Sequence, residues 1–427
     1  MSLARVIMGR TKEGGRRMEK SQKRLWNRNF CLLCQGQFVS ALGDAFYGIA
    51  LNFFVLELTG STAVMGINMA LITLPRVILG PILGVVVDRT DRKKLIVLGD
   101  LVRGVSILLV TIALKVGVLQ IWMLMLVAIL DGICAAFFNP AVESSIPDIV
   151  SDENLMRANS VYQMATTGAD IFGQSLGGAV YSLLGAAFMF FINGISYLIS
   201  AGTELLIQIP HIDKKARKGT LLQDFKDGIY FVMKYEGMIR VIAMSFSVIF
   251  LFGIIRVLII PWFVESPQLG ITKYGILSAV QSVGVLTGMF VLSMITLKAY
   301  QKYACYQTAL FSFIGMIGLA VLCEQFWMIL LLFFGAFVFQ IVFNMIMNAT
   351  VMQRTPADKR GKVSAMKTTL GMAISPLGNF VGGLLGEIWK PQIIILISVL
   401  LSVGIVRFLV VHPTVREFLN YDAQQQE

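Results

Sequence analysis

The chain has 427 residues, of which 56% are hydrophobic and only 14% are charged, and its mean hydropathy is +0.75. About a quarter of the residues of a soluble globular protein are charged, so this composition excludes a soluble enzyme, a coiled coil and a disordered chain. The net charge of +11 suggests nucleic acid as a partner, but the positions of the basic residues argue for another explanation.

Apolar runs long enough to cross a bilayer recur along the whole chain. A membrane-spanning helix needs roughly 20 apolar residues. We therefore predict an all-α integral membrane protein with twelve transmembrane helices. The predicted spans are 29–58, 62–88, 94–114, 119–143, 159–184, 186–208, 239–264, 271–296, 303–323, 326–352, 361–388 and 391–411.

Lys and Arg are concentrated in alternate connections between these spans. With the N-terminus in the cytoplasm, 29 of the 36 basic residues lie in inner segments and three, Lys115, Lys273 and Lys390, lie in outer loops. Cytoplasmic loops of membrane proteins carry an excess of Lys and Arg. We expect a multi-pass protein of the cell (plasma) membrane with both termini in the cytoplasm, and the positive charge reflects this topology rather than nucleic-acid binding.

The longest inner connection, 209–238, divides the chain into two sets of six spans. Its amphipathic part is expected to form a helix at the membrane interface. The predicted organisation is a basic cytoplasmic tail (1–28), a six-helix bundle (29–208), the linker (209–238), a second six-helix bundle (239–411) and a cytoplasmic tail (412–427). Met18 offers an alternative start of translation, so the sequence leaves open whether residues 1–17 are native.

The two sets of spans carry an internal repeat. Met65-Gly66-Ile67 aligns with Tyr274-Gly275-Ile276, and the stretch 173–178 aligns with 378–383, each with the pattern GxxxGG. Parallel repeats of this kind are common in transporters, and small residues let membrane helices approach closely. We expect close helix contacts, at places where the two halves rock, from Gly173, Gly177, Gly178, Gly378, Gly382 and Gly383; simple packing is the alternative.

The loop after the second span carries a recognisable motif. It reads Gly84-Val-Val-Val-Asp88-Arg89-Thr-Asp-Arg92-Lys93-Lys94 and resembles the signature loop G-x-x-x-D-R-x-x-R-R/K of the major facilitator superfamily. Leu42-Gly43-Asp44 and Asn139-Pro140-Ala141 are similar to the branch of macrolide-type efflux proteins and siderophore exporters. The resemblance implies two pseudo-symmetric six-helix bundles around a central cavity.

The motif loop is a candidate conformational latch. A carboxylate–arginine cluster at a seam between helices can form in one conformation and break in another. We predict this role for Gly84, Asp88, Arg89, Arg92 and Lys93. The alternative is an anchor that holds the loop at the anionic inner leaflet.

Three ionisable residues, Asp44, Arg76 and Asp131, fall near the middle of their predicted spans. Charges at this depth are costly and are usually functional. We expect one of the two acids to pair with Arg76 and the other to bind a proton or a cationic substrate, with a purely structural pair as the alternative. Asp170 in span five and Arg256 in span seven are further candidates for substrate or proton binding.

Four other ionisable residues, Glu143, Asp100, Arg103 and Glu204, are predicted to lie near the inner membrane face. At that depth a charged side chain can reach water or a partner on a neighbouring helix. We interpret these four residues first as members of ion pairs at helix seams, with a role in gating as the alternative.

The chain lacks the motifs of a nucleotide-hydrolysing loop, a zinc protease and a serine hydrolase. We therefore expect a non-enzyme with no cofactor and no metal. The predicted function is a secondary active transporter that works by alternating access and exports an amphiphilic small molecule (drug, macrolide-like or siderophore-like) by proton antiport. An importer or uniporter of a metabolite, and a non-transporting lipid-handling or sensor protein, are the alternatives. The expected partners are the substrate, protons or another coupling ion, and membrane lipids, and a monomer is a sufficient working unit.

Overall fold

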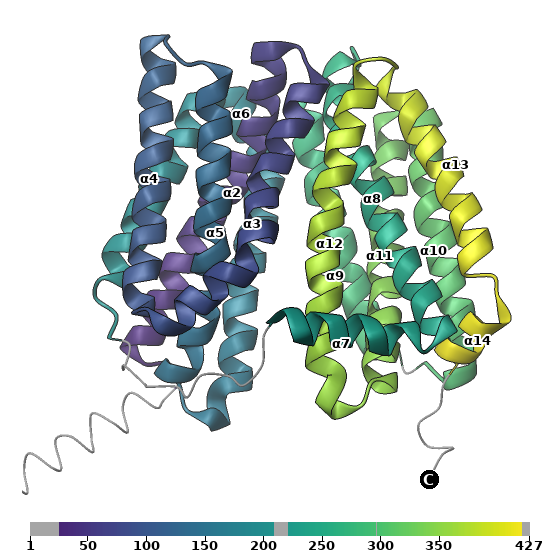
Figure 1. Cartoon of the computed structure of the whole chain (residues 1–427). Coiled ribbons are helices and arrows are strands. Elements are labelled where there is room, and N and C mark those ends of the chain that lie inside the picture. The colour runs from purple at the N-terminus through teal and green to yellow at the C-terminus, as the bar shows by residue number, and fades with distance from the viewer. Residues whose placement is uncertain (1–24, 209–220, 296, 421–427) are drawn as a thin grey trace, which may run out of the picture. The chain divides into compact units, whose positions relative to one another are not determined.

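A computed structural model describes residues 25–208, 221–295 and 297–420, and these residues form helices joined by short loops, without a strand among them (Figure 1). The long helices are α2 (Arg28–Thr59), α3 (Thr62–Arg89), α4 (Arg92–Val116), α5 (Ile121–Ile149), α6 (Leu155–Glu204), α8 (Glu236–Glu265), α9 (Ile271–Met294), α10 (Ala299–Leu322), α11 (Phe326–Arg354), α12 (Ala357–Gly386) and α13 (Pro391–Leu409). The short ones are η1 (Asp152–Asn154), α7 (Leu221–Met233) and α14 (Pro413–Leu419).

Eleven helices of the described chain are long and apolar enough to cross a membrane. One of them, α6, has 50 residues and is interrupted at Gly185, whose φ of 74° and ψ of 176° are not helical. This positive φ suits glycine because a side chain would be strained there. The interruption falls between the predicted fifth and sixth spans, so α6 supplies two crossings and the described helices account for the predicted twelve.

Local signals in the sequence explain where individual helices begin and end. The side chain of Asp91 caps the first turn of α4 by accepting a hydrogen bond from the backbone N–H of Lys93 at 3.0 Å. At the other end of α4, Gly117 adopts a left-handed conformation with φ of 79°, which ends the helix. The motif loop is therefore short because α3 ends at Arg89 and α4 begins at Arg92.

The chain forms two compact units whose borders cut through three helices. Unit 1 contains residues 1–48, 78–173 and 184–217, and unit 2 contains 49–77, 174–183 and 218–427. The second half of α2, the first half of α3 and a middle piece of α6 thus belong with the C-terminal helices. The predicted boundary at 209–238 divides the chain in sequence into two sets of six spans. The two units are defined by contacts instead, so unit 2 also includes pieces of the first set.

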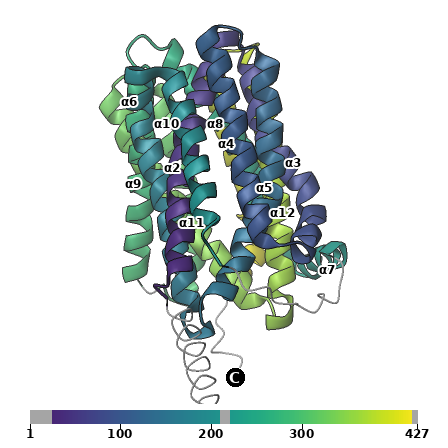
Figure 2. The same ribbon diagram turned by 90° about the vertical axis from the view of Figure 1, so that its left-hand side faces the viewer.

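Unit 1 has an apolar core on the predicted inner side, where Phe30, Leu33, Ile96 and Ile146 are fully buried or nearly so. Helices α4 and α5 pack side by side, as Figures 1 and 2 both show.

Unit 2 has a core rich in aromatic side chains, and a short helix crosses its predicted inner end. Rings such as Phe313 and Phe337, whose centroids lie 6.3 Å apart, fill the space between α8, α10 and α11. Helix α7 runs across the bundle against the first turns of α12 (Figure 1). Its Gly228 packs against the backbone of Lys362, and Asp227 forms an ion pair with the same lysine at 2.6 Å. Helix α7 occupies the stretch expected to be amphipathic, and residues 209–220 of that linker lie outside the described chain.

Candidate functional site

A polar cluster lies in the middle of unit 1, around Asp44 of α2. The Tyr197 hydroxyl donates a hydrogen bond to Oδ1 of Asp44, and Nδ2 of Asn193 lies 3.5 Å from the same oxygen. Both donors are buried on the second part of α6, whereas the Asp44 side chain is exposed. Gly43 allows this arrangement because a Cβ there would meet the side chains of Asn193 and Ser196. Asp44 is thus held by two neutral donors and remains accessible.

The cation of this cluster is Arg103 of α4. Its Nε lies 3.1 Å from Oδ1 of Asp131 of α5, and its guanidinium stacks over the rings of Phe138 and Tyr197 at 4.9 and 5.5 Å from their centroids. The Arg103 side chain is 6% exposed and that of Asp131 is 24% exposed. Such stacking suits the planar, weakly hydrated guanidinium. Arg103 therefore ties α4, α5 and α6 together next to Asp44.

The predicted ion pair of Arg103 at a helix seam is confirmed, because Arg103 of α4 pairs with Asp131 of α5, but Arg103 lies near the middle of its helix rather than near the predicted inner membrane face. Arg103 follows the start of α4 by eleven residues, which at a rise of about 1.5 Å per residue places it roughly 17 Å along the helix, near the middle of a bilayer about 30 Å thick. Arg76 belongs to unit 2, so its expected pairing with one of the acids remains a prediction; Asp131 takes Arg103 as its partner within unit 1.

Asp100 and Glu204 form a separate group in unit 1. Asp100 is 0% exposed and Glu204 is 1% exposed, and the two carboxyl groups interact with each other and with Ser200. Gln37 donates a hydrogen bond to Oε1 of Glu204 at 3.2 Å. Among the contacts described, Glu204 has no basic partner on a neighbouring helix, so the expected ion pair is absent. Its neighbour is the acid Asp100 instead.

The other predicted mid-span residues are distributed over both units. Asp170 is exposed on α6 in unit 1, and Arg76 is partly exposed on α3 in unit 2. Arg256 of α8 is exposed although its neighbours Ile255 and Val257 are buried, and it interacts electrostatically with the partly buried Tyr274 of α9. Arg256 therefore presents an accessible guanidinium from a buried stretch of α8.

Unit 2 joins the first and second sets of spans at a contact that we call the α3–α12 seam, formed by residues 61–66 and 383–387. The Glu387 carboxylate accepts hydrogen bonds from the Ser61 hydroxyl at 2.5 Å and from the backbone N–H of Ala63 at 2.9 Å, and the Thr62 hydroxyl donates to the carbonyl of Gly383 at 2.8 Å. Glu387 thus caps the N-terminus of α3 from the end of α12. These hydrogen bonds, first that from Ala63 and then that from Ser61, hold the pKa of Glu387 below its ordinary value.

Two glycine pairs bring the helix backbones of unit 2 into direct contact. A Cβ on Gly383 would lie 3.0 Å from Cα of Gly66, and a Cβ on Gly178 would lie 2.6 Å from Cα of Gly275. In the internal repeat, Gly66 corresponds to Gly275 and Gly178 corresponds to Gly383. The two contacts are therefore equivalent and reciprocal, as in the interface of a symmetric dimer.

The remaining four glycines of the two GxxxGG stretches also stand at close helix contacts. Gly173 and Gly177 face Ala45 and Ile49 of α2, while Gly378 and Gly382 face the backbone of α8. A larger residue at any of these positions would require the neighbouring helix to move. Their role as hinges remains a prediction.

The motif loop, which connects α3 to α4, makes side-chain contacts with α5 within unit 1. Arg92 forms an ion pair with Asp148, and its Nη1 also donates to the carbonyl of Ser144 at 3.1 Å. No described atom lies within 4 Å of a Cβ built on Gly84. The side chains of Asp88 and Arg89 lie outside the described set, and the latch as a whole remains a prediction.

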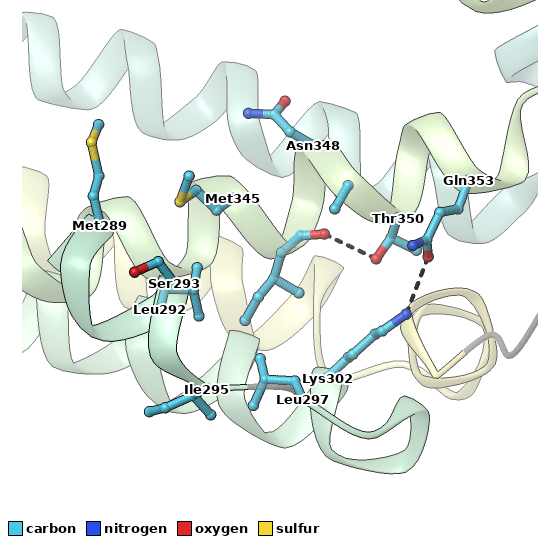
Figure 3. Close-up of a pocket in the computed structure, with 12 residues that line it drawn as sticks. Met289, Leu292, Ser293, Ile295, Leu297, Lys302, Met345, Asn348, Thr350 and Gln353 are labelled. Carbon is cyan, nitrogen blue, oxygen red and sulfur yellow. Dashed lines mark hydrogen bonds between the residues drawn. The ribbon is translucent and has the colours of Figure 1, made fainter.

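A pocket of about 490 Å³ opens between the predicted inner ends of α9 and α11 in unit 2 (Figure 3). Apolar side chains such as Met289, Leu292 and Met345 line most of it. Nζ of Lys302 donates a hydrogen bond to Oε1 of Gln353 at 3.1 Å at one end. The sequence carries no signal for this pocket, because its polar residues come from three separate helices.

Comparison with known proteins agrees with this architecture. Macrolide efflux protein A of Streptococcus pyogenes is 25% identical over 272 residues, which cover 62% of this chain and 67% of that protein. An uncharacterized MFS-type transporter of Bacillus subtilis, YfiS, is 24% identical over 374 residues, covering 83% of this chain and 86% of that one.

Solved structures share the fold at low sequence identity. A bacterial homologue of the iron transporter ferroportin in an inward-facing state has a TM-score of 0.71 at 16% identity, covering 90% of this chain and 99% of that one. A bacterial homologue of the human lysosomal transporter Spinster has a TM-score of 0.67 at 14% identity, covering 92% of this chain and 98% of its own. The chain matches the Major Facilitator Superfamily over residues 33–378. The helices, the internal repeat and this match together establish that the chain belongs to the Major Facilitator Superfamily and is a multi-pass membrane transporter.

Proposed function

We propose that this transporter exports an amphiphilic small molecule by alternating access and that protons entering in exchange supply the energy. The observation that carries the proposal is the accessible carboxylate of Asp44, held by Tyr197 and Asn193 in the middle of a membrane-spanning helix. A charged group at this depth faces water or a partner rather than lipid. Asp44 is therefore placed to be reached by a proton or by a substrate.

The neighbouring charges make Asp44 the preferred exchange site over Asp131. Asp131 has a dedicated cation, since Arg103 is buried against it and stacked on two rings. Asp44 is hydrogen-bonded by neutral groups, so a proton and a cationic substrate can compete for it without displacing an arginine. This competition is what antiport requires, because the two ligands must exclude each other.

The other accessible charges are proposed to contact the substrate. Asp170 and Arg76 lie on α6 and α3, and Arg256 lies on α8 with Tyr274 beside it. Arg256 is suited to an anionic or polar group of the substrate, since its guanidinium is exposed and always charged. Macrolide efflux protein A indicates which amphiphiles to test first, because its name assigns it macrolide efflux.

We further propose that the α3–α12 seam closes the outer side in one conformation and that the motif loop, through Asp88, Arg89 and Arg92, closes the inner side in the other. The excess of basic residues in the predicted inner segments supports an orientation with both termini in the cytoplasm. The cell membrane is the location and a single chain is the working unit, since one chain supplies both sets of six spans.

Everted vesicles from cells that express the protein test this proposal. The vesicle lumen is acidified, a macrolide and a set of cationic amphiphiles are added in turn, and lumenal pH is recorded together with uptake of labelled substrate. We expect substrate to trigger proton efflux with wild type and not with Asp44→Asn. Asp152→Asn, which alters an exposed acid of η1, is the matched control. Substrate uptake without proton movement in wild type would refute antiport, and uptake and proton efflux unchanged in Asp44→Asn would refute the assignment of Asp44.

A further inference from the structure

The acid group of unit 1 formed by Asp100 and Glu204 is not used by the proposed exchange at Asp44. Asp100 lies on α4 and Glu204 near the end of α6, and both are almost completely buried. Carboxylates are rarely buried unless a cation or several hydrogen bonds compensate for lost water. Burial of these two neighbouring acids therefore requires a group that compensates for their lost hydration.

Hydrogen bonds within the protein leave most of this group unsatisfied. Both oxygens of Asp100, Oε2 of Glu204 and the hydroxyl of Ser200 are buried and have no partner at full hydrogen-bond geometry among the described residues. The Ser200 side chain is fully buried and lies against both acids. Gln37 satisfies only Oε1 of Glu204. Three helices thus direct buried polar atoms into one small region.

No nearby base balances two negative charges there. The cation that acts on Asp100 is Arg103, three residues further along α4, and it is already committed to Asp131. The other titratable neighbours are Asp44, which repels a charge on Asp100, and Tyr162, which Glu204 faces. The principal neighbours of Glu204 are Asp100, Gln37 and Ser200, with no cation among them.

The packing favours a proton over a metal ion as the group that compensates for the two buried acids. A Cβ on Gly36 would lie 2.8 Å from the Ser200 hydroxyl and 3.7 Å from Oε1 of Glu204, so the α2 backbone already fills the space beside the acids. A metal ion needs several oxygen ligands around it, and the described residues contain no group of three or more acidic, histidine or cysteine side chains that could hold one. A proton requires no additional volume and lets one acid donate a hydrogen bond to the other.

We infer that Asp100 and Glu204 share one proton and form a second proton-binding site, inside unit 1 and separate from Asp44. Two neighbouring buried carboxylates repel each other when both are ionised, and sharing a proton converts their repulsion into a hydrogen bond. The Ser200 hydroxyl then completes the group as a further donor. This inference does not depend on antiport, because it concerns the resting protein without substrate.

Infrared spectroscopy of the purified full chain in lipid at neutral pH tests the shared proton directly. A protonated carboxyl group has its own carbonyl-stretch band, which shifts in D₂O. We expect this band in wild type, its loss in the double variant Asp100→Asn/Glu204→Gln, and its retention in Asp152→Asn/Glu153→Gln, which alters two exposed acids of η1. Loss of the band in Asp44→Asn with retention in the Asp100/Glu204 double variant would overturn the inference.

Thermal unfolding provides a second readout and tests the competing ligand. Amides mimic the protonated acids in shape and neutrality, so the Asp100→Asn/Glu204→Gln variant should unfold within a few degrees of wild type. Wild type should unfold at the same temperature in NaCl and in choline chloride of equal ionic strength. Stabilisation by Na⁺ that disappears in the double variant would replace the proton by a sodium ion and overturn the inference. If the double variant fails to fold, the same infrared comparison with Glu204→Gln alone decides, since it removes one partner of the shared proton.

Discussion

The Glu387 carboxylate should control how often the α3–α12 seam opens. Replacing it by glutamine keeps an acceptor oxygen for the N–H of Ala63 but removes the negative charge from the N-terminus of α3. A charge at a helix N-terminus contributes about 0.3–1 kcal/mol at an exposed site, and a hydrogen bond to a charged group contributes about 1.5–3 kcal/mol before solvent weakens it. Because Glu387 is largely exposed, we expect a loss of about 1 kcal/mol, or roughly a fivefold rise in the ratio of open to closed seam.

Distance measurements between spin labels can detect this shift. Labels at Leu58 and Ile388, both exposed beside the seam, report separation of α2 from α12 by double electron–electron resonance. Glu387→Gln should increase the longer-distance population about fivefold relative to the shorter one. Glu265→Gln, which alters an exposed acid at the end of α8, should leave the distribution as in wild type. An unchanged distribution in Glu387→Gln would show that Glu387 does not hold the seam, and the reasoning from its hydrogen bonds would be refuted.

Three further predictions concern the seam and the mid-span pair. Arg103→Leu should lower the free energy of unfolding by about 3 kcal/mol, because it leaves the Asp131 charge without its partner, and adding Asp131→Asn should recover much of this loss in thermal unfolding; no recovery would contradict the pairing. Gly383→Val should shift the same spin-label distances toward the open seam more than Glu387→Gln does, since its Cβ would lie 2.6 Å from the carbonyl of Thr62, and a closed distribution in this variant would contradict the close contact. The pKa of Glu387 is lowered when the seam is closed, so its stabilisation is complete at neutral pH and is lost only as the outer pH falls below the ordinary glutamate value toward the lowered one; labels that separate on raising the pH instead would contradict this sign.

The all-helical membrane fold was predictable from the sequence because the bilayer imposes it, whereas the orientation of the termini remains a prediction. A run of apolar residues must span, and Lys and Arg must remain on one side. Even the division of α6 at Gly185 was visible as the gap between two predicted spans. The close contacts of the GxxxGG stretches could be expected for the same reason, since glycine is where membrane helices approach most closely.

The partners of the mid-span charges were harder to predict. Depth along a helix can be counted, and such a count would have placed Arg103 beside Asp131, but the direction in which a side chain points around the helix depends on packing. Asp100 and Glu204 illustrate this limit, because their positions suggested ion pairs and their orientation brings the acids together. The seam was missed for a related reason: Glu387 lies at the end of a helix, and nothing in the sequence indicates that it caps α3, which lies more than 300 positions earlier.

The reciprocal glycine pairs, Gly66 with Gly383 and Gly178 with Gly275, also have a mechanical consequence. Two separate points of backbone contact restrict both the separation of the paired helices and the rotation of one helix against the other. Loss of one contact leaves the other as a pivot, so the helices can swing before they part. A bulky residue at any one of the four glycines should therefore produce partial opening by rotation, whereas one at each pair should be needed for the full displacement.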